Sequence, residues 1–474
     1  MKIEQIYTGC LAQGAYYIES NGEAVVIDPL REITPYIQRA QASGVKIKYV
    51  FETHFHADFV SGHIDLAKAT GAQIVYGPTD MQLGFDSIVA TDNQVFKVGN
   101  ISFTLLHTPG HTMESSCYLL KDENGNDKAI FTGDTLFIGD VGRPDLAQKV
   151  VANLTQDKLA SYLFDSLREK IMPLSDDLIV YPAHGAGSAC GKNMSKETSD
   201  TLGNQKRTNY ALRADMTKDE FIKEVITGLM PPPPYFPKNV AMNISGYDTI
   251  DEVLTRGTQA LSAEAFEAAA NETGAIVLDT RAAQVYAKGF IPNSINIGVD
   301  GSFAVWVGTL IPDIKQEILL ITDEGREEEV VTRLARVGYD HAIGFLKGGF
   351  HSWIEVGKEI DTIKTISVEE FTAAEVANPE INILDVRKQS EFLSEHIVNA
   401  TNIPLDYINE NMASVDKDKT YYVHCAGGYR SMIFTSILRA RGFNNLIDVD
   451  GGFKAIKESN KFNITDYVCP STLL

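Results

Sequence analysis

The hydrophobic positions in the first half of the chain form short runs separated by amphipathic stretches. Residues 24–27, 47–52, 101–106, 130–133 and 179–182 are apolar or alternate between apolar and polar side chains, which predicts β-strands. Residues 33–43, 61–70 and 157–171 have helical spacing, and Gly44 ends the first of these helices. This alternation predicts an α/β fold, consistent with an αββα sandwich that carries its site at one edge.

The second half of the chain repeats itself, which predicts two modules of one α/β fold. Residues 261–266 match 366–371, residues 277–281 match 383–387, residues 291–297 match 397–403, and residues 348–350 match 451–453. A proline run at residues 231–237 separates this half from the first and predicts a stiff connector. We therefore expect a first domain over residues 1–235 and two further domains over residues 250–360 and 365–465.

Composition and charge narrow the function classes. A chain of 474 residues is long enough for about three domains, and its 44% hydrophobic content is ample for their cores. The net charge of −21 argues against binding to nucleic acid or to anionic membranes. Because no signal-type or membrane-spanning stretch is present, we expect a cytoplasmic protein. The five cysteines are scattered, which indicates neither a disulfide framework nor a zinc knuckle. Nothing in the sequence decides the oligomeric state, and a homo-oligomer is compatible with it.

Ligand-type side chains follow four of the predicted strands. The strand at 47–52 is followed by the segment THFHAD, and later strand ends run into the segments TPGHT, TGD and PAHG. Imidazoles and carboxylates bind metal ions, and strand ends are where α/β sheets present ligands. We expect the two histidines of THFHAD to project to the same side, close enough to share a cation. In the second segment, His111 is better placed than His107, which directly precedes that segment. The candidate metal residues are His54, His56, Asp58, His111, Asp134 and His184.

The motifs HxHxD, PGHT, TGD and PAHG, in this order, resemble the metallo-β-lactamase superfamily over roughly the first half of the chain. Hydrolytic members such as glyoxalase II carry HxHxDH, whereas this sequence has Phe59 at the last position. A phenyl ring has no lone pair to donate. A complete second metal site, with the bridging hydroxide of a two-metal hydrolase, is therefore not expected.

Within that superfamily the chain resembles the persulfide dioxygenases, which hold one iron ion. The resemblance implies one Fe(II) per chain, bound by His54, His111 and Asp134, with open positions for a substrate sulfur and O₂. It makes His56, Asp58 and His184 groups that orient ligands or substrate, or alternative metal ligands. A similar Gly-Arg-x-Asp segment in that family suggests that Arg143 either binds the carboxylate of a thiol substrate or fixes its loop. The glycine-rich residues 185–192 lack a Walker ending and are expected to cover the metal pocket.

The second repeat contains a loop that resembles the active-site loop of rhodanese sulfurtransferases. A strand at residues 421–424 runs into the segment CAGGYRS and then into an amphipathic helix. Backbone N–H groups and the helix N-terminus would surround the sulfur of Cys425, the expected nucleophile, and stabilise a persulfide anion. We expect Gly427 and Gly428 to bind substrate and Arg430 to take part in catalysis. In the first repeat Asp323 aligns with Cys425, so that module is expected to be structural or a docking surface.

Together these features predict a metallo-β-lactamase αββα sandwich followed by two rhodanese-like α/β domains. The expected activity is oxidation of a low-molecular-weight thiol persulfide by O₂ to sulfite, coupled to sulfur transfer that gives thiosulfate. The main alternative is a glyoxalase II-like thioester hydrolase with a rhodanese appendage, since one zinc ion can also activate water. A non-catalytic sulfur carrier or scaffold is the third class. The sequence does not identify the thiol.

Overall fold

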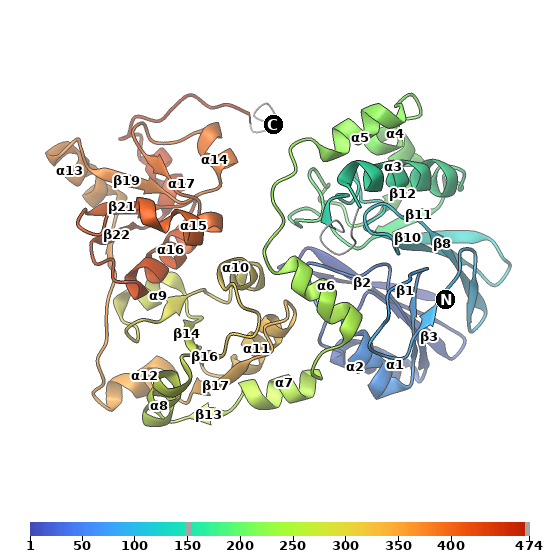
Figure 1. Cartoon of the computed structure of the whole chain (residues 1–474), viewed down its shortest axis with the longest axis horizontal. Helices are drawn as coiled ribbons and strands as arrows, with labels where there is room; N and C mark the ends of the chain where they lie inside the picture. Colours follow the sequence, from blue (N-terminus) through green and yellow to red (C-terminus); the bar gives the residue numbers. More distant parts are fainter. Residues whose placement is uncertain (147–153, 470–474) are drawn as a thin grey trace. The chain divides into compact units, whose positions relative to one another are not determined.

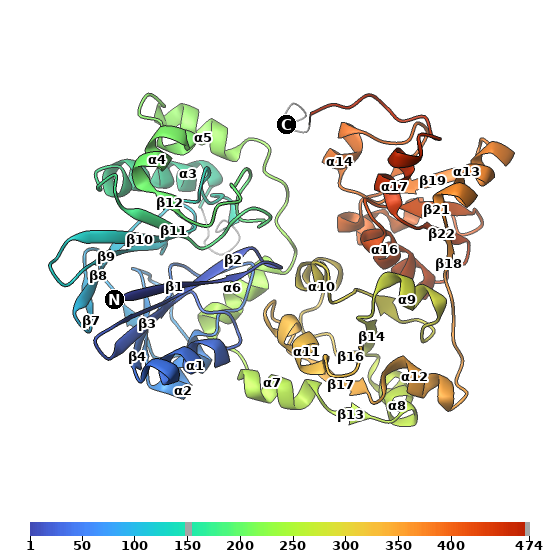
Figure 2. The same ribbon diagram turned by 180° about the vertical axis from the view of Figure 1, so that it is seen from behind.

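The chain forms two compact units in the computed structural model, which describes residues 1–146 and 154–469 (Figures 1 and 2). One unit comprises Met1–Glu252 together with the short segment Ala335–Gly338, and the other comprises the rest of the described chain.

The first unit contains two six-stranded sheets. One sheet runs in chain order through β1 (Lys2–Thr8), β2 (Gln13–Ser20), β3 (Glu23–Ile27), β4 (Lys46–Phe51), β5 (Gln73–Tyr76) and β6 (Ile88–Val89). The other runs through β12 (Asp200–Thr201), β11 (Ile179–Pro182), β10 (Asp127–Gly133), β9 (Ser116–Lys121), β8 (Ile101–His107) and β7 (Val95–Val98).

Helices cover the outer face of each sheet, so the first unit is an αββα sandwich (Figures 1 and 2). The first sheet packs on α1 (Thr34–Ser43) and α2 (His63–Thr70), and the second packs on α3 (Gln156–Ser166) and α5 (Lys218–Ile226), with α4 (Leu202–Thr208) nearby. Between the sheets, Phe51, Phe103 and Phe131 form part of a buried aromatic core. Each such ring stabilises the fold by about 1.5–3 kcal/mol relative to exposure. The predicted architecture is confirmed.

The first unit continues beyond the proline run at which we expected its domain to end. Helix α6 (Phe236–Ser245) follows that run, and the Asn243 side-chain amide donates to the carbonyl oxygens of His56 and Phe59, at 2.8 and 2.9 Å. Helix α7 (Ile250–Gly257) comes next. The sequence shows the break at the prolines but not this tertiary contact, because Asn243 is nearly two hundred residues away from its partners.

The second unit contains two five-stranded parallel sheets with the same strand order. The first has the order β13 (Ala260–Leu261), β17 (Ala342–Leu346), β16 (Ile318–Ile321), β14 (Ile276–Asp279) and β15 (Ile295–Asn296). The second has the order β18 (Lys364–Ile366), β22 (Leu446–Val449), β21 (Tyr421–His424), β19 (Asn382–Asp385) and β20 (Thr401–Asn402). The first module carries α8 (Ala263–Thr273), α9 (Ala283–Lys288), α10 (Phe303–Leu310), α11 (Glu327–Ala335) and α12 (Gly349–Glu355). The second carries α13 (Val368–Ala377), α14 (Gln389–Ser394), α15 (Ile408–Asn411), α16 (Tyr429–Ala440) and α17 (Gly452–Ser459).

A buried ion pair occurs at the same place in both modules. Arg281 binds Asp279 in the first, and Arg387 binds Asp385 in the second, each with 2.5 Å between Nη2 and Oδ2. In each case the arginine also donates to a backbone carbonyl eight residues further along the chain. The sequence repeat therefore corresponds to a structural repeat, and the two modules share even this ion pair.

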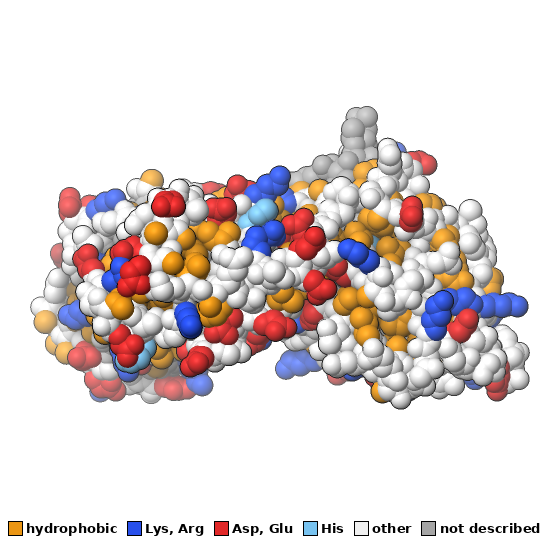
Figure 3. All heavy atoms as spheres, turned by 90° about the horizontal axis from the view of Figure 1, so that it is seen from below, with side chains coloured by type: hydrophobic (Ala, Val, Ile, Leu, Met, Phe, Trp, Pro, Cys, Tyr) orange, Lys and Arg blue, Asp and Glu red, His pale blue; other side chains and the backbone are white. Residues whose placement is uncertain are grey.

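The surface agrees with the acidic composition. On the face shown in Figure 3, Asp and Glu side chains are spread among Lys and Arg side chains, in keeping with the net charge of −21. Among the described residues, no helix combines the length and the apolar character needed to cross a membrane.

Candidate metal centre and cysteine loop

Three ends of strands in the first unit bring together two histidines and an aspartate. His54 follows β4, His111 follows β8, and Asp134 follows β10. Nε2 of His54 and Nε2 of His111 lie 3.8 and 3.4 Å from Oδ2 of Asp134, and all three residues are buried. Such separations are expected of atoms that each lie about 2.1 Å from one shared ion. Within the described residues, Oδ2 of Asp134 has no hydrogen-bond partner, so the three side chains fit a divalent cation.

Hydrogen bonds fix the ring nitrogen that each histidine presents. Nδ1 of His111 lies 2.8 Å from the carbonyl oxygen of Arg143, which can only accept, so Nδ1 carries the proton and Nε2 has a free lone pair. Nδ1 of His54 lies 3.0 Å from the Thr53 hydroxyl, which donates to Asp28 at 2.8 Å and therefore accepts from His54. Both rings thus turn Nε2 toward Asp134.

The charges in this cluster suit a cation. Burial lowers the pKa of His54 well below its usual range, so its ring is neutral. Burial alone would raise the pKa of Asp134, but the imidazoles of His184, His54 and His111 outweigh this and hold it far below its usual range. Asp134 is therefore an anion that faces Nε2 of His54 and Nε2 of His111, which is the donor set of a facial two-histidine, one-carboxylate site.

His184 lies behind this set and joins two carboxylates. Its Nδ1 lies 2.8 Å from Oδ1 of Asp134, and its Nε2 lies 2.8 Å from Oδ2 of Asp58. Burial lowers the pKa of His184, but the two carboxylates raise it well above its usual range. Its ring holds the Asp134 carboxylate in place. The Cys190 sulfur belongs to the same group, because its Sγ and the donor atoms of Asp58 and His184 all lie within 4.8 Å of one another.

His54 and His56 lie close together, but the His56 ring faces a different pair of carboxylates. The two ring centroids are 4.2 Å apart, but Nε2 of His56 lies 3.1 Å from Oδ1 of Asp28 and 3.4 Å from Oε2 of Glu52. The segment after β4 is an irregular loop rather than a strand, so alternation does not apply. Burial lowers the pKa of His56, but Asp28 and Glu52 raise it to about 10. The donor atoms of His56, Asp28 and Glu52 all lie within 4.8 Å of one another, so these residues form a candidate cation group of their own.

The Arg143 side chain makes four hydrogen bonds to residues in the described part of the chain. Its guanidinium donates to both carboxylate oxygens of Asp145, at 2.6 and 2.7 Å, and to the carbonyl oxygens of Ala189 and Met230. Its carbonyl oxygen holds His111. Of the two roles expected for Arg143, these contacts favour fixing the loop over binding a substrate carboxylate.

A cavity of about 450 Å³ opens beside His111, a volume typical of small-molecule sites. Its walls are mostly apolar and include Phe55, Met113 and Ile244. Glu114 also lines it, accepts the backbone N–H of Phe55 at 2.8 Å, and has its pKa raised by burial. The cavity can therefore hold a small molecule beside His111.

The second module presents Cys425 at the end of β21, where helix α16 begins. Cys425 is buried, and its Sγ accepts the backbone N–H of Gly428 at 3.1 Å. Gly428 has φ +100°, a backbone conformation that favours glycine, and it caps α16. Arg430 makes two hydrogen bonds to Glu391, at 2.6 and 2.9 Å. The backbone thus points a donor at the sulfur, as a persulfide-holding loop requires.

An aspartate without a counterpart in the first module lies behind this loop. Asp448 is buried on β22, paired across the sheet with Val423, two residues before Cys425. Burial raises the pKa of Asp448 to about 7, and Ser431 lowers it only in part.

This aspartate predicts a pH-dependent stability. Since the folded-state pKa of Asp448 is raised, its contribution is fully present below the unfolded value of 3.8 and is lost as the pH rises through 7. We expect the free energy of unfolding to fall by up to about 1.4 kcal/mol per pH unit over this range. Both tryptophans, Trp306 and Trp353, lie in the second unit, so their fluorescence during urea unfolding follows it. Asp448→Asn should remove this part of the slope; an unchanged slope would contradict the assignment.

The parts of the chain that carry these two sites match known protein families. Residues 8–184 match the metallo-beta-lactamase superfamily, and residues 262–356 and 368–459 match the rhodanese-like domain. A crystal structure of a metallo-beta-lactamase from Staphylococcus aureus is 32% identical with a TM-score of 0.63, covering 73% of this chain and 98% of that one. The chain belongs to the metallo-beta-lactamase superfamily. It also carries two rhodanese-like domains, as the resemblance implied.

Curated relatives within this superfamily include hydroxyacylglutathione hydrolases. GloC of Haemophilus influenzae is 27% identical over 236 residues, which are 45% of this chain and 99% of that protein. A hydroxyacylglutathione hydrolase of Tolumonas auensis is 31% identical over 172 residues, or 36% of this chain. The chain spans 60% of the length of the Tolumonas protein. Members of the superfamily bind metal ions, and the His54, His111 and Asp134 cluster suits one.

The sequence alone did not single out several residues of the metallo-beta-lactamase unit. Asp28 and Glu52 orient His56, yet each reads as an ordinary residue next to a strand. Cys190 lies beside Asp58 and His184. Its position in a glycine-rich loop that was expected to cover the pocket was the available signal.

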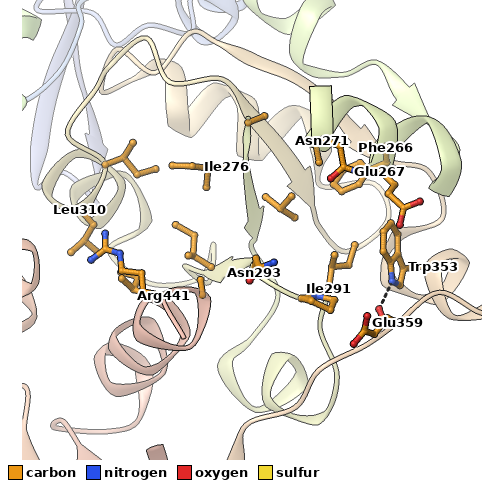
Figure 4. Close-up of a pocket in the computed structure, with 18 of the residues that line it drawn as sticks. Phe266, Glu267, Asn271, Ile276, Ile291, Asn293, Leu310, Trp353, Glu359 and Arg441 are labelled. Atoms are coloured by element: carbon orange, nitrogen blue, oxygen red, sulfur yellow. Dashed lines mark hydrogen bonds between the residues drawn. The ribbon is translucent and has the colours of Figure 1, made fainter. Parts of the chain in front are cut away.

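A larger cavity, of about 540 Å³, lies in the second unit (Figure 4). Phe266, Ile276 and Trp353 line it from the first rhodanese-like module, and Arg441 lines it from the second. No histidine or cysteine is among its lining residues. Cys425 does not line it, so this cavity is separate from the cysteine loop.

Proposed function

We propose that the chain is a persulfide dioxygenase joined to a sulfurtransferase. The first unit oxidises the sulfane sulfur of a low-molecular-weight thiol persulfide to sulfite, and Cys425 combines sulfite with a second sulfane sulfur to give thiosulfate. The observation that carries this proposal is the convergence of His54, His111 and Asp134 beside a mostly apolar cavity. Two imidazoles and one carboxylate with open positions are typical of non-haem Fe(II) oxygenases.

Phe59 and His56 support a single metal ion. Phe59 is fully buried, and its ring packs on the His56 ring with 4.3 Å between centroids. His56 faces Asp28 and Glu52. Phe59 has no donor atom, and His56 is turned toward these two carboxylates, so neither residue completes a second donor set beside Asp134, as a bridged pair of metal ions would need.

The surrounding residues hold this set in place while substrate binds. His54, His111 and Asp134 would hold an Fe(II) ion, which would supply the chemistry that joins a persulfide sulfur to O₂. The Arg143 carbonyl fixes the His111 ring, and His184 fixes the Asp134 carboxylate. The apolar walls of the cavity would pack on the apolar part of the thiol. One persulfide, one O₂ and one water give one thiol, one sulfite and two protons, and the sulfane sulfur provides the electrons that reduce O₂.

Cys425 performs the transfer without net oxidation. Its thiolate attacks the sulfane sulfur of a second persulfide, the sulfur–sulfur bond of that donor breaks, and the donor thiol leaves as a thiolate. After the new persulfide loses its proton to solvent, sulfite attacks the outer sulfur and Cys425 leaves as a thiolate. The Gly428 N–H and the N-terminus of α16 stabilise the negative sulfur at both stages.

A thioester hydrolase remains the second candidate, because the chain covers 99% of GloC, a hydroxyacylglutathione hydrolase. The two activities are separated by assaying one protein preparation, loaded with iron or with zinc, on a glutathione persulfide and on a glutathione thioester. We expect sulfite only from the iron-loaded protein with the persulfide. Hydrolysis of the thioester by the zinc-loaded protein, without sulfite in any arm, would replace the proposal with the hydrolase.

Phe59→His tests whether this ring limits the site to one ion. The variant restores an imidazole at the position where two-metal relatives carry one, next to Asp58 and His184. We expect metal content to rise from about one to nearly two ions per chain, because the added ring completes a second donor set. Phe59→Leu is the matched control, since it removes the ring without adding a ligand. Equal metal content in the two variants would contradict the role assigned to Phe59.

A further inference from the structure

The rhodanese-like module without a cysteine packs against the helix that follows the cysteine loop. Helix α16 contacts β15 and α9 of the first module, and α9 lies beside it in both views (Figures 1 and 2). Met432 of α16 shares a buried cluster with Tyr286 and Phe290. The Asn296 N–H donates to the Ser436 hydroxyl at 2.9 Å. The sulfur-bearing helix is thus fixed along its length by the other module.

This contact extends into the cysteine loop through Tyr429. The Tyr429 hydroxyl donates to the carbonyl oxygen of Gly298 at 2.7 Å. A Cβ on Gly301 would lie 2.3 Å from Cζ of Tyr429, so only glycine leaves room for this ring. Tyr429 directly follows Gly428, whose N–H faces the Cys425 sulfur.

A second bridge reaches the other side of the loop. The Gln284 side-chain amide of the first module donates to Asp450 at 2.8 Å, just before Gly451 and Gly452. A Cβ on Gly452 would lie 2.6 Å from the Cys425 carbonyl oxygen, so this turn is in close contact with the loop. The first module therefore holds both the loop and the turn that supports it.

We propose that the cysteine-lacking module positions the sulfur-carrying loop of the other module, with Tyr429 as the positioning residue and residues 298–301 as its seat. The inference rests on the proposed transfer function of Cys425. The Gly428 N–H stabilises a negative sulfur only if it stays aimed at Sγ, and a donor already in place costs no reorganisation during the reaction. Misplacement by about 1 Å can lower a rate about a hundredfold. In the first module an acidic loop replaces the cysteine loop. If this module positions the Cys425 loop, it needs no nucleophile of its own.

Tyr429→Phe in the full-length chain tests this role. Tyr339→Phe is the matched control, because its hydroxyl makes a similar buried bond, to the carbonyl oxygen of Ile311, within the first module. We expect Tyr429→Phe to lower the kcat for thiosulfate formation from persulfide and sulfite about tenfold with an unchanged KM for sulfite. Amide hydrogen exchange over residues 425–431 should become faster. Tyr339→Phe should match the natural chain in both measurements, and oxygen consumption should be unchanged in both variants.

Gly301→Ala is a second variant, which changes the residues that contact the Tyr429 ring rather than Tyr429 itself. Its φ lies outside the left-handed region, so alanine fits the backbone and only the Tyr429 ring is displaced. Gly9→Ala, where a Cβ meets open space, is its control. Natural rates and natural exchange in both Tyr429→Phe and Gly301→Ala would overturn the inference. The exchange measurement needs no sulfur transfer, so failure of the transfer function and failure of this inference give different results.

Discussion

Replacing His111 with alanine is expected to remove both bound iron and oxygen consumption. Its Nε2 faces Oδ2 of Asp134 at 3.4 Å, and its Nδ1 is held by a backbone carbonyl. Mutation of a residue that only supports a metal ligand typically lowers metal affinity or activity by about 10- to 100-fold. Loss of a ligand itself should therefore lower metal affinity and oxygen consumption by at least about a hundredfold. Metal content after dialysis, and oxygen consumption with a persulfide, are the measurements.

His107→Ala is the matched control, because His107 lies in the same turn and lines the same cavity. Its Nε2 lies 2.8 Å from the carbonyl oxygen of Met113, so it faces the backbone rather than the metal residues. We expect this variant to keep its iron and most of its oxygen consumption. If His107→Ala lost iron and His111→Ala kept it, the ligand set would be wrong.

Cys425→Ser is expected to abolish thiosulfate formation while oxygen consumption continues. Serine cannot form a persulfide, and removal of a nucleophile typically lowers a rate by at least about a thousandfold. The oxygenase residues are in a different compact unit, so sulfite should accumulate in place of thiosulfate. Chromatographic separation of sulfite from thiosulfate measures both products in one reaction.

Cys469→Ser controls for the loss of a thiol, because Cys469 is exposed. This variant should form thiosulfate at the natural rate. Thiosulfate formed at the natural rate by Cys425→Ser would show that sulfur is transferred elsewhere in the chain and would refute the role assigned to Cys425.

The sequence pattern alone singles out the three side chains that the structure brings together as the candidate metal centre. His54, His111 and Asp134 each follow a strand, and strands of one sandwich present their ends at a shared edge. The position of His56 could not be predicted in the same way. It depends on Asp28, which has φ +50°, and on Glu52, whose carboxylate turns toward the same ring. These two carboxylates reach His56 only because β3 and β4 are neighbours in the folded sheet.

In the second half, too, features that are local in the sequence could be predicted and contacts between distant residues could not. The internal repeat predicted two modules, and the CAGGYRS segment predicted the cysteine loop, because each pattern consists of consecutive residues. The seat of Tyr429 was not predicted. Gly298 and Gly301 precede Tyr429 by well over a hundred residues, and their need to be glycine arises from a ring that belongs to the other module. Contacts of this kind depend on how the two modules pack against each other. The hydrophobic periodicity of the sequence does not predict that packing.

The most direct test of the central claim is oxygen consumption by the iron-loaded chain when a low-molecular-weight persulfide is added, with sulfite measured in the Cys425→Ser variant so that none is converted onward. The proposed reaction predicts about one O₂ consumed for each sulfite formed, and none when zinc replaces iron. Persulfide added to the iron-loaded chain with no oxygen consumed and no sulfite formed would contradict the account.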